Sequence, residues 1–188
     1  IALKHGLNAT FMPKPYEKIN GSGMHTHISL TEDGENCFYH PNKPYDLSDK
    51  ALYFIGGLIN HIGAITALTN PTINSYKRLV PGYEAPVNIS WGRHNRSVLI
   101  RVPHTSTPKT STRIELRSPD PTANPYLAFT GILKAGLHGI DEKIEPPEPV
   151  EEDLYEMEAT TKEERGIGTL PESLSDALDA LEKDEVVR

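Results

Sequence analysis

The sequence predicts an α+β fold in which an antiparallel-rich sheet is backed by helices. Two segments, 48–70 and 124–140, repeat apolar residues at three- and four-residue spacing, which is typical of helices with one buried face. Several shorter segments alternate apolar and polar residues and are therefore predicted to be strands. The two kinds of segment do not alternate regularly along the chain, which favours α+β over a parallel α/β fold.

Composition limits the function classes. The 188 residues are enough for one sizeable core, and the net charge of −7 argues against a nucleic-acid partner, which needs clustered Lys and Arg. No apolar run approaches the roughly 20 residues that span a bilayer, so no membrane partner is expected. A single cysteine, Cys37, excludes an internal disulfide and fits a reducing compartment, so we expect a cytoplasmic protein.

The first predicted strand follows a glycine-rich turn in "INGSGMHTHISL", residues 19–30. From Gly23 onward the residues alternate, so His25, His27 and Ser29 should project from one face of the strand. The next segment, "EDGEN", predicts a turn. Two histidines on one strand face suit a metal site, but taken alone such pairs are more often structural or solvent-facing.

The segment 48–70 predicts one long helix that Ser48 caps and that Asn70-Pro71 ends. His61 lies inside this helix, where we expect a packed histidine and no ligand. Residues 71–86 are rich in Pro and Gly and carry Arg78 and Glu84, which predicts an irregular functional loop.

Three further strands are predicted at 87–92, 97–103 and 112–118. In the last, "TRIELRS", alternation places Glu115 between Arg113 and Arg117 on one face. The helix at 124–140 has Pro125 in its first turn. An acidic, Pro-rich linker and a short amphipathic helix should make residues 141–188 a peripheral segment.

A group of histidine, glutamate and arginine residues emerges from these predictions. Charged side chains on a buried sheet face are costly unless they meet opposite charges or a metal. An acidic chain that gathers arginines near a His/Glu pair suits a multiply anionic ligand, because guanidinium binds phosphate and carboxylate in a bidentate way. Taken singly, the motifs also fit a cross-strand ion-pair ladder and an ordinary turn.

Four motifs, "NGSGMHTHISL", "NSYKRLVPGYEAPV", "NRSVLIRVP" and "RIELRSPDPTANPYLAF", closely resemble the catalytic domain of class I glutamine synthetases of bacteria and archaea. This resemblance implies ATP-dependent ligation of ammonia to L-glutamate through γ-glutamyl phosphate, with Mg²⁺ or Mn²⁺. It also implies an incomplete barrel of strands backed by helices, and a parent protein that is a homo-dodecamer of two stacked six-membered rings.

The resemblance implies a role for each matching residue. It implies glutamate binding by Asn20, Gly21, Arg78, Glu84, Arg96 and Arg117, and ATP binding by His27, Ile28, Ser29, Arg96, Arg101 and Lys109. His25 and Glu115 are the implied metal ligands, while Glu84 and Arg96 are the implied catalytic residues. Tyr155 matches a position that some members adenylylate, although the residues after it lack the Pro-rich continuation of that loop.

The resemblance further implies that the N-terminal β-grasp domain and the first part of the catalytic domain are absent from residues 1–188. We therefore expect this chain alone to be inactive. Two alternatives remain open: a γ-glutamyl ligase that uses another amine, and a structural homologue without catalysis.

Overall fold

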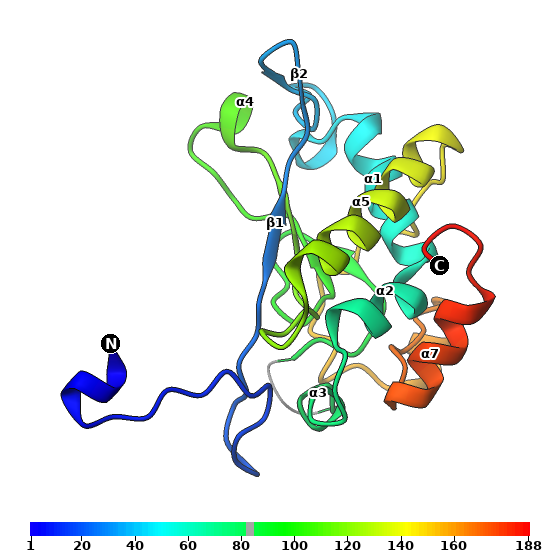
Figure 1. Cartoon of the computed structure of the whole chain (residues 1–188). Coiled ribbons are helices and arrows are strands. Elements are labelled where there is room, and N and C mark those ends of the chain that lie inside the picture. The colour runs from blue at the N-terminus through cyan, green and yellow to red at the C-terminus, as the bar shows by residue number, and fades with distance from the viewer. Residues whose placement is uncertain (82–84) are drawn as a thin grey trace.

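The computed structural model describes residues 1–81 and 85–188, and it confirms the α+β class. Its main sheet has four strands in the order β1-β6-β5-β4, with helices α1, α2 and α5 to one side of it (Figure 1). The β1–β6 and β6–β5 pairs are antiparallel and the β5–β4 pair is parallel, so the sheet is mixed with mainly antiparallel pairing. The described strands form an open row, so the barrel curvature stays a prediction.

The strands fall inside the predicted segments but are shorter. They are β1 (Thr26–Ile28), β4 (Trp91–Gly92), β5 (Ile100–Arg101) and β6 (Ile114–Leu116). Their apolar side chains enter the core, where Ile100, Ile114 and Leu116 are fully buried. The opposite face is therefore left to the polar residues of the alternating pattern.

The predicted turn at "EDGEN" joins β2 (Thr31–Glu32) to β3 (Glu35–Asn36). Both turn residues, Asp33 and Gly34, have positive φ values, 52° and 83°. A two-residue connection with this backbone matches the twist of a hairpin, which explains the Asp-Gly pair.

The prediction of one helix over 48–70 is wrong. The segment forms α1 (Asp49–Asn60) and α2 (Ile62–Thr69), which meet at a 75° bend. Ser48 caps α1 as predicted, since its side chain accepts a hydrogen bond from Ala51 N. At the bend, buried His61 has Nδ1 2.7 Å from Asp184 Oδ2 and Nε2 3.0 Å from His138 Nδ1. Apolar periodicity continues through the bend because both helices face the same core.

The second predicted helix is α5 (Pro125–Asp141), and Asn124 caps it through bonds from Tyr126 N and Leu127 N. It packs closely on α1: the two backbones are so near each other that a Cβ atom added at Gly57 would lie 2.8 Å from Gly139 Cα. These two helices form the main layer behind the sheet, as Figure 1 shows.

The remaining elements are short, apart from the helix near the C-terminus. The predicted irregular loop contains one helical turn, α3 (Ser75–Arg78), and the polar link before β6 contains another, α4 (Pro108–Ser111). The others are the 3-10 turns η1 (Ala2–His5) and η2 (Pro44–Asp46) and the helices α6 (Ala159–Glu164) and α7 (Leu174–Lys183).

Residues 141–188 make specific contacts with the rest of the chain. Val150 N donates to Trp91 O over 2.8 Å, Leu170 N donates to Val87 O over 2.8 Å, and α7 packs on α2. The division of this segment from the rest stays a prediction. Across the described residues, no single helix is long and apolar enough to cross a membrane, and only the bent pair α1–α2 passes that test jointly.

Candidate functional site

The face of the sheet opposite the apolar core carries a row of polar side chains centred on Glu115. In the register of the sheet, Glu115 on β6 lies opposite His27 on β1 and opposite Arg101 on β5. Directly opposed residues project from the same face, so pairing alone brings these three side chains together. His25 lies one residue before β1 and joins them; His25, His27, Arg101 and Glu115 are called the strand-face cluster below.

Glu115 is 3% exposed and is held from several sides. Arg101 Nε donates to Glu115 Oε2 over 2.6 Å, while His25 Nδ1 and His27 Nε2 lie 3.0 Å and 3.8 Å from Oε1. Burial acts to raise the pKa of Glu115, but Arg101 and the two histidines outweigh it and leave the pKa lowered. The carboxyl group is therefore ionised at neutral pH.

Burial and the nearby cations Arg117 and Arg78 lower the pKa of His25, against the opposing effect of Glu115. A neutral imidazole nitrogen beside an ionised carboxylate is a donor pair for a divalent cation. The described residues contain no group of three or more His, Cys, Asp or Glu that could hold a metal ion. Within the described residues, this pair could supply two ligands but not a complete coordination shell.

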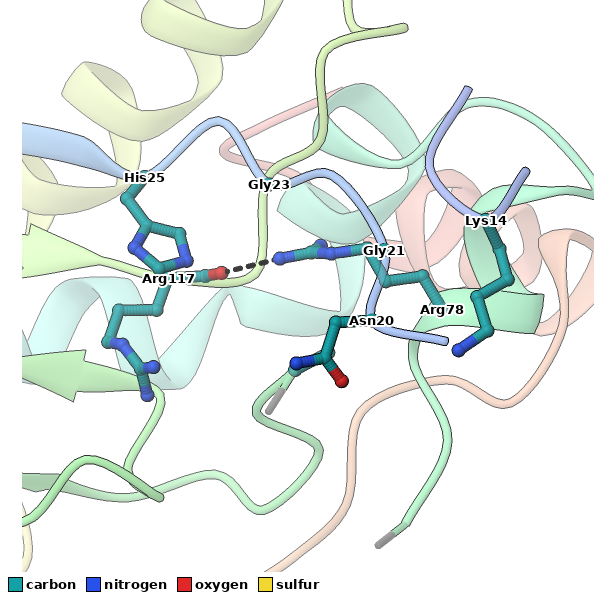
Figure 2. A pocket seen from close by; sticks show the side chains of 8 residues that line it. Lys14, Asn20, Gly21, Gly23, His25, Arg78 and Arg117 are labelled. Atoms are coloured by element: carbon teal, nitrogen blue, oxygen red, sulfur yellow. Dashed lines mark hydrogen bonds between the residues drawn. The ribbon is translucent and has the colours of Figure 1, made fainter. Parts of the chain in front are cut away.

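A pocket of about 370 Å³ lies beside His25 (Figure 2). Three of its described lining side chains are cationic and none is a carboxylate, which suits an anionic ligand. We call it the cationic pocket; it is lined by Lys14, Asn20, Gly21, Gly23, His25, Arg78, Ala85 and Arg117.

Arg78 is buried, at 4% exposure, and backbone carbonyls hold it in place. Its Nη1 donates to Ser118 O over 2.6 Å and its Nη2 to Arg117 O over 3.2 Å; Figure 2 draws a hydrogen bond between Arg78 and Arg117. Burial lowers the pKa of Arg78 to about 10, so the side chain is still a cation at neutral pH. Arg117 is held in the same way, since its Nη1 donates to Arg96 O and, over 3.0 Å, to Val98 O.

The Gly-Ser-Gly turn is explained by this packing. A Cβ atom at Gly23 would lie 2.6 Å from Arg78 Nη2, and one at Gly21 would overlap Pro13 O. Only glycine lets the backbone pass this close to the buried arginine, so the turn forms a wall of the pocket.

A second hollow of about 390 Å³ shares His25 and Arg117 with the cationic pocket. Its other lining residues are Arg96, Arg101, Glu115 and Tyr155. The strand-face cluster and the cationic pocket are thus neighbours, and a ligand in one would lie next to a ligand in the other.

Other candidates lie apart from the two hollows. Lys109 is exposed on α4, where its Nζ is 3.3 Å from Glu35 Oε2. Ile28 is buried in the core, and Ser29 is exposed just beyond β1. Glu84 lies outside the described residues.

The structure adds two residues at or beside the site that the sequence did not single out as site residues. Lys14 lines the cationic pocket, and its Nζ donates to Ile19 O over 2.5 Å. Arg113 Nε donates to His27 Nδ1 over 3.1 Å. The alternation of "RIELR" placed Arg113 on the face of Glu115 and was a usable signal, whereas no pattern marks Lys14.

Comparison with known proteins identifies the family of this chain. Residues 1–188 match the family model described as glutamine synthetase, catalytic domain. Curated glutamine synthetases from Thermotoga maritima and Pyrococcus abyssi are 56% and 60% identical over the whole chain. The chain spans 42% of the length of each of these relatives.

Solved structures agree with this match. One described as apo GmaS without ligand has a TM-score of 0.85 and 43% identity over 99% of this chain and 41% of its own. Another, described as a GmaS/ADP complex, has a TM-score of 0.85 and 42% identity over 98% of this chain and 42% of its own.

Proposed function

Because the chain belongs to the glutamine synthetase catalytic-domain family, we propose that the full-length protein ligates ammonia to the γ-carboxylate of L-glutamate. ATP drives the reaction through γ-glutamyl phosphate, and the products are L-glutamine, ADP and phosphate. One observation carries the proposal: a pocket lined by three cations and no described carboxylate adjoins the hollow that contains His25, Glu115 and two further arginines.

Glutamate would occupy the cationic pocket. Arg78 and Arg117 would offset its carboxylate charge, and Asn20 and Gly21 would hold its amino-acid end. The fit rests on charge, since Arg78 is buried, protonated and fixed by two carbonyls.

The phosphates of ATP would lie in the second hollow, opposite Arg96 and Arg101. His27, Ile28 and Ser29, on β1 and just beyond it, would contact the nucleotide, and Lys109 would have to leave Glu35 to reach it. The ADP complex named for the GmaS structure supports a nucleotide site in this fold.

His25 and Glu115 would hold Mg²⁺ or Mn²⁺ together with ligands from outside the described residues. A divalent ion, when bound, offsets the charge that gathers when ATP meets glutamate. Arg101 keeps Glu115 ionised, which keeps its oxygen atoms available to a cation.

The chain's own residues would then favour phosphoryl transfer by charge and position. A carboxylate is a poor electrophile, so its phosphorylation must precede attack by ammonia, and Arg96 would stabilise the transferring group. Glu84 lies outside the described residues; by the resemblance it would accept the proton of ammonium and help exclude water.

The proposal concerns the full-length protein, because this chain spans only about two fifths of the curated relatives. We propose that the full-length protein has the incomplete barrel and the dodecameric assembly of the family. The single cysteine also supports a cytoplasmic location.

The test is an assay of the full-length protein with L-glutamate, ATP and a choice of acceptor. We expect glutamine with ammonium and at least about a hundredfold lower rates with putrescine or ethanolamine. Faster turnover of either amine would favour the alternative ligase, and no turnover with any acceptor would favour the homologue without catalysis. Residues 1–188 alone should form no glutamine.

A further inference from the structure

We propose that Asn70 and Asp120 are positioning residues that fix the guanidinium group of Arg78 in the cationic pocket. They do so through the turn at residues 117–120, and neither lines the pocket. The inference rests on the proposed function, since it assigns a role in glutamate binding.

Asp120 is fully buried and its carboxylate accepts bonds on both oxygens. Oδ1 accepts from Thr122 N over 2.9 Å and from Thr122 Oγ1 over 2.5 Å, and Oδ2 accepts from Asn70 Nδ2 over 3.0 Å. Asp120 N in turn donates to Thr69 O at the end of α2 over 3.1 Å. The turn is thereby anchored to the helix layer.

Asn70 links this anchor to the arginine. Its side chain is fully buried, and Nδ2 donates to Ser118 O over 2.9 Å as well as to Asp120. Ser118 O also accepts from Arg78 Nη1 over 2.6 Å. One carbonyl thus takes a bond from Asn70 and a bond from Arg78, so the Asn70 amide sets where that carbonyl points.

The same turn carries two other parts of the pocket wall. Arg117 belongs to the turn, and its carbonyl accepts the second bond from Arg78. Pro119 O accepts from Met24 N over 2.8 Å, one residue before His25. A shift of the turn would therefore move Arg78, Arg117 and His25 together.

Charge adds to the geometry. Arg78 donates hydrogen bonds to the neutral carbonyl groups of Ser118 and Arg117, and the negative charge of Asp120 opposes the lowering of the Arg78 pKa by burial. A buried carboxylate that reaches the arginine through one intervening turn stabilises the cation without occupying the pocket.

The decisive variant is Asp120→Asn in the full-length protein. It keeps the volume, but the new amide must face either the donors of Thr122 or the donor of Asn70. We expect glutamate to bind about tenfold more weakly by calorimetry, with a matching rise in KM and less than about a threefold change in kcat. Asn70→Ser, which removes both donors, should act in the same direction if Asp120→Asn proves insoluble.

Thr122→Val is the matched control. It removes one bond to the same carboxylate on the side away from Asn70, so it should lower Tm and leave glutamate affinity within about twofold. Lowered Tm with unchanged glutamate affinity in Asp120→Asn and Asn70→Ser would overturn the inference. So would equal weakening of glutamate binding by Thr122→Val.

Failure of the proposed function gives a different result. Wild-type protein that binds glutamate but makes no glutamine would contradict the proposed activity alone. The ratio of the glutamate dissociation constants of variant and wild type would still decide whether Asn70 and Asp120 position Arg78. Wild-type protein that binds no glutamate would overturn both.

Discussion

The strand-face cluster and the cationic pocket share His25, yet they are built in different ways. In the cluster, Glu115 and its partners His27 and Arg101 lie opposite one another on three neighbouring strands. In the pocket, Lys14, Asn20, Arg78 and Arg117 come from a loop, a helical turn and the end of a strand. The first is a product of regular pairing, and the second of irregular backbone packed at close range.

The difference shows in what holds each charge. Glu115 is held by side chains of opposite charge, above all Arg101. Arg78 and Arg117 are held by the carbonyl groups of residues 96, 98, 117 and 118. The cluster should therefore respond to changes of charge, and the pocket to changes of backbone position.

Glu115→Gln should produce the largest effect. It keeps the size of the side chain but removes the negative charge that faces Arg101, His25 and His27. We expect kcat for glutamine formation in the full-length protein to fall about a hundredfold or more, with a smaller change in glutamate KM. Glu32→Gln is the control, because Glu32 is an exposed partner of Lys50. Equal activity of the Glu115 variant and wild type would show that the charge of the strand-face cluster is not needed for catalysis.

Gly23→Ala should have an intermediate effect, and it should change glutamate KM more than kcat. The new Cβ atom would lie 2.6 Å from Arg78 Nη2 and must displace it. We expect glutamate KM to rise about tenfold while kcat changes less. At Gly168 an added Cβ atom meets Ile89 Cδ1 at an ordinary 3.6 Å, so Gly168→Ala should leave both constants unchanged. A fall in kcat alone for Gly23→Ala would mean that cluster and pocket are not distinct.

The smallest effect should come from Asp184, which lies away from both regions. Burial acts to raise its pKa, but bonds from Val187 N, His61 and Val186 N outweigh this and lower it. The folded form thus binds protons less readily than the unfolded form, so this stabilisation is present above about pH 4 and is lost as pH falls further.

Asp184→Asn should therefore lower Tm at pH 7 by a few degrees and reduce the loss of Tm below pH 4. Thermal unfolding of residues 1–188 at several pH values measures this, with exposed Asp179→Asn as the control. If Tm of the Asp184 variant falls below pH 4 as steeply as Tm of the wild type, Asp184 does not contribute to the acid dependence of stability.

Much of the fold follows from local patterns. Alternation placed Glu115 and Arg113 on one face, and the Asn124-Pro125 start predicted α5. The bend at His61 was missed because apolar periodicity is the same in one long helix as in two helices around one core. What fixes the bend is a histidine bonded to His138 and Asp184, which are distant in sequence.

The sequence by itself determined the family, the strand faces and the residue types of the cluster, because long motifs and a period of two are local properties of the chain. Only the tertiary structure decided that Lys14 lines the cationic pocket and that Lys109 forms an ion pair with Glu35. It also decided that buried Asn70 and Asp120 bond to each other at the turn that accepts the hydrogen bonds of Arg78. These contacts join residues far apart in sequence, and their geometry depends on backbone positions that no local pattern encodes.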